Sequence, residues 1–447
     1  MTSQVWKVAV IGAGPAGMFA TDVLTSRDDV HVHVFEKLFA PDGLLRFGVA
    51  PDHPSIKRLS KSFDKTRARP NKRFFGGIRY GEDMGLDELK ASYHHVIFAH
   101  GAASDRRLGI PGEETPGVFS AREFVEWYNG HPEAKDYRFP LDVEEAVVVG
   151  AGNVALDVAR ILLRPIEDLE TTDIANHALE VLRTSKIRRV HLLVRRGPAN
   201  VSFTLPEIRN LASLEGVRVI VSPDDFVLTA DDRARIGMDR GLARILEVLE
   251  SCVGPDVEPT DDARVLRFHF FTSPIAVEGE ARMTSLRCIR NERVVQPDGS
   301  CKLRQQAGTG FSIPAEFLLR SIGYQVAPTA GLPYDEKKQV IRNVDGQVVD
   351  DSNQPLEGIW VTGWARRGPS GVVGTNKADA QEVANAILAQ CEGPPPPRTE
   401  WTPPKPVLVD CEGWRRIDEE EQRRGEKRGR PREKFVRHED VAAFLDS

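Results

Sequence analysis

Short apolar runs followed by glycine turns recur along the chain, and each run has the length of one buried strand. The first run is Val8–Ile11, a helix-like pattern follows from about Pro15 to Ser26, and a second strand is expected at Val30–Phe35. His95–His100 is another such run. Buried strands that alternate with amphipathic helices are typical of parallel sheets. This part of the chain is therefore predicted to be an α/β unit.

The same alternation begins again in the second third of the chain. A strand is expected at Ala146–Val149, then a glycine turn and a helix that ends at about Leu163, where Pro165 interrupts the pattern. The next strand is expected at Arg189–Val194. The repeated pattern predicts an α/β fold with two Rossmann-like dinucleotide-binding domains.

Other segments predict elements of more mixed character. Asp231–Leu249 has the spacing of one long amphipathic helix. The runs Arg264–Thr272, Arg282–Arg290 and Phe311–Ser321 resemble the strands of an antiparallel meander. A final helix is expected at Val372–Gln390, after a strand and turn, and we expect this part of the chain to return to the first domain.

Two stretches hold many residues that break regular structure. Pro41–Pro54 contains too many glycines and prolines for a strand or a helix interior, so a loop is expected there, followed by a helix at Ser55–Arg67. Gly393–Pro397 is a proline-rich break. In the charged tail beyond it, Trp414–Arg424 and His438–Leu445 are expected to form short helices.

The chain has 447 residues, which is too many for a single hydrophobic core. We predict a first domain made of residues 1–107 and 323–392, with a second domain at 108–322 inserted into it. Residues 393–447 are expected to be a charged extension that docks on the first domain.

Composition and charge exclude several classes of function. A net charge of −6 gives no general attraction to nucleic acid. No apolar run reaches the roughly 18–20 residues needed to span a bilayer, and the first strand begins too near the N-terminus for a leader peptide, so a cytoplasmic location is expected. None of the five cysteines forms a C-x-x-C pair, which argues against a redox dithiol, an iron–sulfur cluster and a zinc site. We expect free thiols and no metal.

The first glycine turn has the sequence G-x-G-x-x-G, from Gly12 through Gly14 to Gly17. The first glycine permits a tight turn, the second permits close approach of a pyrophosphate, and the third lets the helix pack on the strand. The helix N-terminus then faces the phosphates. The second strand ends in Glu36, 24 residues beyond Gly12, where a carboxylate accepts hydrogen bonds from ribose hydroxyls. We therefore interpret the first glycine turn and Glu36 as a dinucleotide-binding site.

The second glycine turn has Gly150, Gly152 and Ala155 in G-x-G-x-x-A order. Where an NAD site would carry an acid, this chain has Arg195 and Arg196. Guanidinium groups offer paired donors and a fixed charge, and therefore favour the 2′-phosphate of NADP. The first turn suits FAD and the second suits NADP(H), and together they indicate a flavin-dependent NADPH oxidoreductase.

The motifs of this chain resemble the adrenodoxin reductase family, and more closely its bacterial ferredoxin–NADP reductases. The most specific matches are GVAPDHP at Gly48–Pro54 and GW-x-x-RGP-x-G-x-x-GTNK at Gly363–Lys377. The resemblance implies a glutathione-reductase-like fold, FAD and NADPH as cofactors, and an iron–sulfur protein as the electron partner. It further implies that a hydride passes from NADPH to FAD and that single electrons then pass from reduced FAD to a ferredoxin.

The resemblance also assigns candidate site residues. His53 and Glu207 match a pair near the redox centre and are expected to tune and orient rather than to carry obligatory chemistry. Expected cofactor contacts are Gly12, Gly14, Pro15, Ala16, Gly17, Glu36, Lys37, Gly43, Leu44, Arg79, Gly101, Gly152, Asn153, Val154, Ala155, Leu156, Arg195, Arg196, Glu207, Gly363, Trp364, Gly371, Val372 and Val373. Trp364 could equally be an ordinary buried aromatic residue.

Two positions depart from the family pattern. Gly17 replaces an alanine found in some members, with no expected consequence. Phe47 replaces a small residue, which leaves open how tightly the surrounding loop packs.

Alternatives to a ferredoxin reductase are an NADPH-dependent flavin monooxygenase, a diaphorase and a non-enzymatic flavin redox sensor. The small subunit of glutamate synthase has a related core, but its cysteine-rich N-terminal region is missing here. For a ferredoxin partner we expect a basic patch, because ferredoxins are typically acidic. Candidates for that patch are Arg183, Lys186, Arg188, Arg189, Arg233, Arg240 and Arg244. A monomer is expected.

Overall fold

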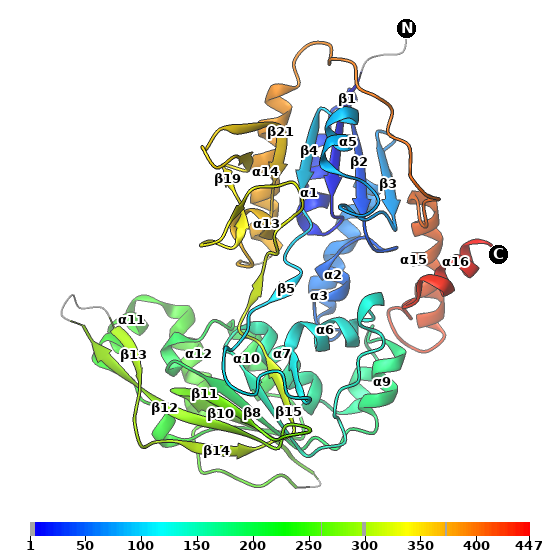
Figure 1. Ribbon diagram of the computed structural model, residues 1–447. Helices are drawn as coiled ribbons and strands as arrows, with labels where there is room; N and C mark the ends of the chain where they lie inside the picture. The colour runs from blue at the N-terminus through cyan, green and yellow to red at the C-terminus, as the bar shows by residue number, and fades with distance from the viewer. Residues whose placement is uncertain (1–4, 261, 297–300, 372) are drawn as a thin grey trace. The chain divides into compact units, whose positions relative to one another are not determined.

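The structure is a computed structural model that describes residues 5–260, 262–296, 301–371 and 373–447. The chain forms two compact units (Figure 1). The first unit contains Met1–Arg106, Asn129–Pro132 and Gly323–Ser447, and the second contains Arg107–Tyr128 and Glu133–Ile322. The sequence predicts a second domain that is continuous from residue 108 to 322. In the structure, the short segment Asn129–Pro132 within that range packs with the first unit.

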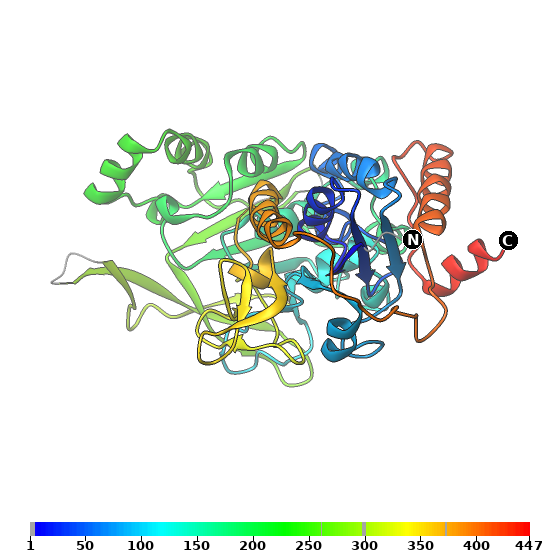
Figure 2. The same cartoon turned by 90° about the horizontal axis from the view of Figure 1, so that it is seen from above.

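A seven-stranded sheet forms the centre of the first unit, in the order β19-β20-β21-β4-β1-β2-β3. The five strands from β21 to β3 run parallel, and β20 and β19 add an antiparallel edge. Helices α1 (Pro15–Leu24) and α14 (Val373–Gln390) lie side by side on this sheet (Figures 1 and 2). The strand bounds are β1 Trp6–Ile11, β2 Val30–Glu36, β3 Lys72–Gly76, β4 His95–Phe98, β19 Asn343–Val344, β20 Gln347–Val349 and β21 Pro355–Val361.

The apolar runs of the sequence are the interior of this unit. Val8, Val10 and Ile97 are fully buried between the sheet and the two helices, whereas Ala9 and Phe98 are buried on the opposite face. Because both faces of the central strands are covered, these strands are continuously apolar rather than alternating.

The segment after β2 is more ordered than predicted. The expected loop contains the short helix α2 (Leu44–Phe47), and the expected helix is divided into α3 (Pro54–Lys57), a 3₁₀ segment (Arg58–Phe63) and α4 (Asp64–Arg67). Phe47 is buried, with its ring edge-on to His131 at 5.0 Å between centroids. The loop is therefore tightly packed around Phe47.

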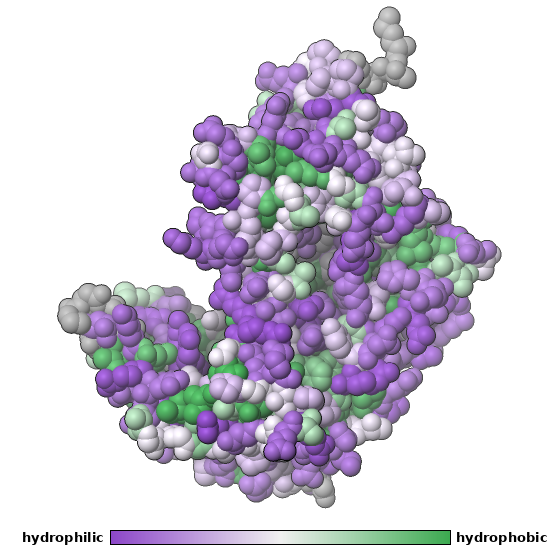
Figure 3. Space-filling view, in the orientation of Figure 1, coloured by the Kyte–Doolittle hydropathy of each residue, from purple (hydrophilic) through white to green (hydrophobic). Residues whose placement is uncertain are grey.

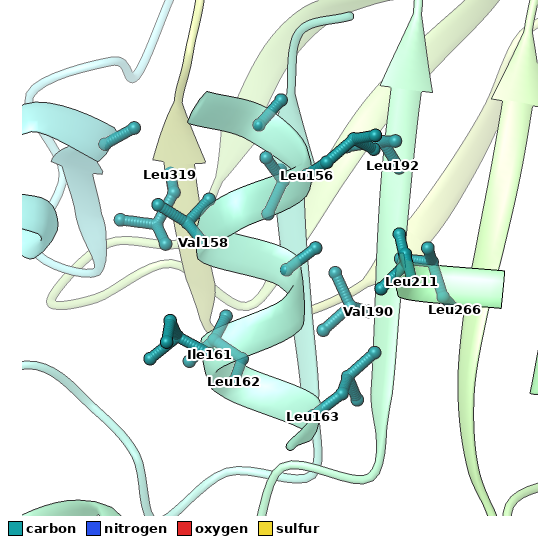
Figure 4. Packing of buried hydrophobic residues seen from close by; sticks show 14 of the residues in the cluster. Leu156, Val158, Ile161, Leu162, Leu163, Val190, Leu192, Leu211, Leu266 and Leu319 are labelled. Carbon is teal, nitrogen blue, oxygen red and sulfur yellow. The ribbon is translucent and has the colours of Figure 1, made fainter. Parts of the chain in front are cut away.

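The second unit is built on a parallel six-stranded sheet in the order β6-β15-β7-β8-β10-β9. Figure 4 shows how α7 (Asn153–Leu163) packs on it: Leu156, Val158 and Ile161–Leu163 of the helix lie among apolar side chains of the sheet such as Val190 and Leu192. The strand bounds are β6 Val118–Ser120, β7 Glu145–Val149, β8 Arg189–Val194, β9 Val217–Val221, β10 Arg264–Phe270 and β15 Phe317–Arg320.

Two sequence predictions for the second unit are wrong. Residues of the expected meander at Arg264–Phe270 and Phe317–Arg320 belong to the parallel sheet as β10 and β15, because these strands pair in parallel with β8 and β7. The antiparallel sheet consists instead of β11 (Thr272–Glu278), β12 (Ser285–Val295), β13 (Cys301–Gln305) and β14 (Phe311–Pro314).

The expected long helix at Asp231–Leu249 is two helices, α11 (Ala230–Met238) and α12 (Arg240–Ser251). Asp239 lies between them with extended backbone angles, and its carboxylate accepts hydrogen bonds from the backbone N–H groups of Gly241 and Leu242. Asp239 ends α11 and is the N-cap of α12, because an N-cap residue does not have helical backbone angles.

The charged C-terminal segment packs against the first unit. Gly76 of β3 donates its backbone N–H to the carbonyl of Val409 at 2.8 Å, and Trp401 lies edge-on to Phe35 and Phe75. Helices α15 (Cys411–Glu426) and α16 (His438–Leu445) follow at the β3 edge (Figures 1 and 2). The two expected tail helices are thus present.

Within the described ranges, we find no helix that combines the length and the apolar character of a membrane span. The face drawn in Figure 3 is mostly hydrophilic, with apolar residues in small patches. Cys252, Cys288, Cys391 and Cys411 are free thiols, and the side chain of Cys301 lies outside the described residues.

Candidate dinucleotide-binding sites

The first glycine turn is too crowded for any other residue at two of its positions. Gly12 has φ of +106°, and a Cβ atom on it would lie 2.7 Å from the carbonyl oxygen of Ala99. A Cβ atom on Gly17 would lie 2.0 Å from the carbonyl oxygen of Gly12. Glycine is therefore required at both positions of this backbone, since any side chain would force the turn to move.

Gly14 provides the open space that a pyrophosphate requires. The nearest described atom to a Cβ on Gly14 would be the Cα of Gly43, at 3.9 Å. Two further glycines close around the turn: Gly43 with φ of +46°, whose Cβ would lie 2.9 Å from the Cα of Gly14, and Gly363 with φ of +65°, whose Cβ would lie 2.7 Å from the Cβ of Ala16. Pro15 begins α1 here. The structure thus brings together residues from three distant parts of the sequence.

Glu36 lies at the end of β2 and is buried. One carboxylate oxygen accepts the backbone N–H of Ala13 at 2.9 Å, and the other accepts the backbone N–H of Leu38 at 3.1 Å. Burial raises the pKa of Glu36 above its ordinary value, and the backbone hydrogen bonds only partly offset this. Because each carboxylate oxygen has a further lone pair, Glu36 can still accept from two ribose hydroxyls.

Trp364 begins the short helix α13 (Trp364–Arg367), and its ring lies 5.4 Å from that of Tyr324. The indole N–H of Trp364 and the hydroxyl of Thr362 are both buried without a hydrogen-bond partner among the described residues. Buried polar groups normally have partners. These two orphaned groups, next to Gly363 and the glycine turn, fit a site that a polar cofactor completes.

The other predicted residues of the first unit have varied surroundings. Leu44 is exposed, whereas His53 is buried immediately before α3. Gly101 has φ of +79° and open space after β4, and Gly371 has φ of +78° near the start of α14. Arg79 pairs with Glu82 at 3.4 Å, and Lys37 is partly buried. Val373 is the first residue of α14, and Val372 lies outside the described residues.

The second glycine turn has one crowded and one open position. A Cβ atom on Gly150 would lie 2.2 Å from the carbonyl oxygen of Ser321, whereas Gly152 has no described atom within 4 Å. Asn153 begins α7, and its side-chain oxygen accepts the backbone N–H of Thr204 at 2.8 Å. Val154 is half-buried, and Ala155 and Leu156 are buried under the turn.

Arg195 and Arg196 follow β8 and are exposed. Their backbone is anchored: Arg195 accepts the Asn291 side-chain N–H at 3.0 Å through its carbonyl, and Arg196 accepts the Phe271 backbone N–H at 3.1 Å. Throughout the described ranges, no hydrogen bond or ion pair engages either guanidinium group. Two fixed positive charges therefore face solvent on a rigid backbone, as a phosphate site requires.

Glu207 lies in the first turn of α10 (Leu205–Ala212) and is buried. One of its carboxylate oxygens accepts a hydrogen bond at 3.3 Å from Arg160, which also donates to Asp157 at 2.7 Å. Sequence reasoning missed Arg160. The available signal was a charged residue in the apolar face of the α7 helix, since such residues are rarely buried without a partner.

The structure removes Arg189 from the predicted basic patch and divides the helix that was expected to carry part of it. Arg189 is buried and bound to Asp256 and Glu258, so it is unavailable on the surface. Arg233 is on α11, whereas Arg240 and Arg244 are one turn apart on α12, and the break at Asp239 removes the common helix that the spacing required.

Comparisons with known proteins agree with this architecture. A family model described as pyridine nucleotide-disulphide oxidoreductase matches residues 6–196. The NADPH-ferredoxin reductase FprA of Mycobacterium tuberculosis is 41% identical over 451 residues, which cover 96% of each chain. The mitochondrial NADPH:adrenodoxin oxidoreductase of Homo sapiens is 37% identical over 98% of this chain and 92% of that protein. A solved structure of Mycobacterium tuberculosis FprA in complex with NADPH has a TM-score of 0.90 and 37% identity, covering 99% of this chain and all of that one.

Proposed function

This chain belongs to the adrenodoxin reductase family, and from that premise we propose that it is an FAD-dependent NADPH–ferredoxin reductase. The observation that carries the proposal is the chemical difference between the two turns. The first ends in the buried acid Glu36, which suits ribose hydroxyls, and the second ends in the exposed Arg195 and Arg196, which suit a 2′-phosphate. One chain with both sites is suited to pass electrons from NADPH to a bound flavin.

The residues of the first unit fit FAD. Gly14 and the N-terminus of α1 would face the pyrophosphate, Glu36 the adenosine ribose, and Trp364 the flavin end, where its orphaned N–H needs an acceptor. FAD, when bound, supplies the conversion between two-electron transfer from NADPH and one-electron transfer to an iron–sulfur protein. The chain itself binds, orients and shields, so no nucleophile or metal is needed.

His53 and Glu207 are proposed to position rather than to react. The Arg160 guanidinium holds Glu207 at one orientation, so the carboxylate acts as a fixed charge in the second unit. Glu207→Gln and His53→Gln should slow flavin reduction by NADPH in stopped-flow measurements without abolishing it. Complete loss of reduction, with the flavin still bound, would contradict this role.

The electron partner is proposed to be an acidic ferredoxin that docks through exposed arginines of the second unit. Arg240 and Arg244 are tested first because both are exposed and lie one turn apart on α12, whereas Arg183, Lys186 and Arg233 are exposed elsewhere in this unit. Arg240→Glu combined with Arg244→Glu should weaken ferredoxin-dependent turnover and spare a small neutral acceptor. Salt should act in the same way, since screening limits the field to about 8 Å at physiological ionic strength. Equal effects on both acceptors would move the docking surface elsewhere. We further propose a cytoplasmic monomer.

The deciding experiment uses the purified chain. Its visible spectrum should show a bound flavin that NADPH bleaches rapidly, and addition of a ferredoxin with cytochrome c as reporter should give continuous turnover. A flavin that NADPH reduces but that transfers electrons only to oxygen or small acceptors would favour a diaphorase instead. A chain without flavin would reject the proposal.

A further inference from the structure

Glu421 is a carboxylate in the C-terminal helix α15 that has no exposed surface. Its two oxygens accept two hydrogen bonds from Arg46, at 2.8 and 2.5 Å, one from Arg432 at 3.0 Å and one from the backbone N–H of Phe435 at 2.8 Å. Four donors match the approximately four lone-pair sites of a carboxylate. Although burial raises the pKa of Glu421, attraction to Arg46 and Arg432 keeps that pKa below its ordinary value.

The charges around Glu421 balance. Arg46 and Arg432 are positive, and Asp418 supplies a second negative charge through a 2.7 Å hydrogen bond from Arg432. The Arg46 guanidinium is buried, between the rings of Phe47 at 5.3 Å and Trp414 at 5.4 Å. A buried pair of this kind is costly to break, because the remaining partner is left as an uncompensated charge.

Arg46 belongs to α2, the short helix that follows the crowded glycine of the FAD site. Gly43 is the N-cap of α2 and packs against Gly14, and Asp42 donates its backbone N–H to the carbonyl of Ala13 at 2.8 Å. A four-residue helix has too few internal hydrogen bonds to be stable alone. Its position against the glycine turn therefore depends on what holds its other end.

The C-terminal segment holds that end at two points. The Glu421 carboxylate accepts a bidentate hydrogen bond from the Arg46 guanidinium. Lys434 donates to the Arg46 carbonyl oxygen at 3.4 Å and to the Asn129 carbonyl oxygen at 3.1 Å. The contacts of Glu421 and Lys434 with Arg46 join residues 375 and 388 positions apart in the chain. The segment from α15 to Phe435 thus contacts and stabilises α2, the helix that follows Gly43.

We propose that Glu421 is a positioning residue for FAD: through Arg46 it fixes α2, so that Gly43 and Leu44 remain closed over the glycine turn. This inference rests on the proposed binding of FAD at that turn. It gives the C-terminal extension a role in retaining the cofactor, in addition to covering the edge of the sheet. Loss of the Arg46–Glu421 contact would open the FAD site at the first glycine turn without removing any group that contacts FAD.

The test measures the release of FAD from the holoenzyme by the rise of flavin fluorescence after dilution. Glu421→Gln keeps the side-chain size but leaves the Arg46 charge buried without its counter-charge, and it should release FAD at least about tenfold faster, which corresponds to about 1.4 kcal/mol. Glu419→Gln is the matched control, because Glu419 is exposed on the same helix and pairs only with Arg415 among the described residues. The control should stay within about twofold of the wild-type rate.

A purely structural role would lower the melting temperature without changing the release rate or the visible flavin spectrum of the folded holoenzyme. A folded Glu421→Gln variant with the wild-type release rate overturns the proposal. If that variant does not fold, Arg46→Lys provides the test instead. It keeps the positive charge but loses the bidentate hydrogen bond to Glu421, and it should release FAD several times faster than the wild type. An unchanged rate in Arg46→Lys overturns the proposal. A wild-type chain that binds no flavin would instead reject the proposed function.

Discussion

The two glycine turns of this protein share one sequence pattern and differ in what surrounds them. At the first turn, Gly12, Gly17, Gly43 and Gly363 are all too close to neighbouring atoms for a side chain, and Glu36 is buried and held by two backbone N–H groups. At the second turn, Gly150 is crowded as Gly12 is, and Gly152 is open as Gly14 is, but the charged residues at the end of the next strand are exposed arginines.

This difference indicates two kinds of cofactor binding. A site closed on several sides, with its acceptor already oriented, is suited to retain a cofactor through many reaction cycles. A site that ends in two solvent-exposed arginines is suited to a cofactor that binds and leaves in each cycle, and the positive charges speed its capture. The comparison therefore separates a resident flavin from an exchanging nucleotide.

The largest expected effect comes from adding one methyl group to each turn. Gly17→Ala should lower the free energy of unfolding by roughly 1–3 kcal/mol, because the new Cβ is forced against the Gly12 carbonyl, and it should reduce the flavin content. Gly152→Ala should cost less than about 1 kcal/mol, the ordinary difference between these residues at an N-cap. Urea unfolding followed by flavin fluorescence measures both. Similar losses in the two variants would contradict the crowding at Gly17.

The next effect separates the two nucleotides at the second turn. Arg196→Ala removes a charge-assisted contact to the 2′-phosphate and should raise the KM for NADPH roughly ten- to a hundredfold. The KM for NADH should stay nearly unchanged, because NADH has no such phosphate. Steady-state kinetics with both nucleotides and a small neutral acceptor provides the test, with Arg240→Ala as the control for loss of an exposed charge. Equal losses with NADPH and NADH would refute the phosphate assignment.

The smallest effect is a pH dependence that belongs to the first turn. Burial raises the pKa of Glu36, so in the flavin-free site it takes up a proton at a higher pH than an ordinary glutamate. Because FAD's ribose hydroxyls donate best to the ionised form, FAD binding should strengthen as pH rises through this pKa and weaken several-fold as pH falls. FAD release rates across pH, for wild type and Glu36→Gln, give the measurement. A variant with the same pH dependence as wild type would exclude Glu36 as the titrating group.

Local chemistry explains why much of the site could be predicted. The helix His438–Leu445 and the strand Arg189–Val194 could be predicted from their own residues, and the glycine turns could be recognised from the spacing of their glycines. Arg160 was missed because its partner Glu207 is 47 residues away, and Asp239 was read as a helix interior because a cap can be recognised only when the backbone turns there. The same holds for β10 and β15, whose partners decide which sheet they join.

The sequence by itself determined the two α/β dinucleotide units and the opposite charge at their second strands, because these depend on contacts between near neighbours along the chain. Only the tertiary structure decided that Gly43, Gly363 and the first turn meet, that Arg195 and Arg196 stay exposed while Arg189 is buried, and that Glu421 reaches Arg46. Such contacts join residues that are not near neighbours along the chain, up to 375 positions apart for Arg46 and Glu421. They follow from how whole elements pack together rather than from any local pattern.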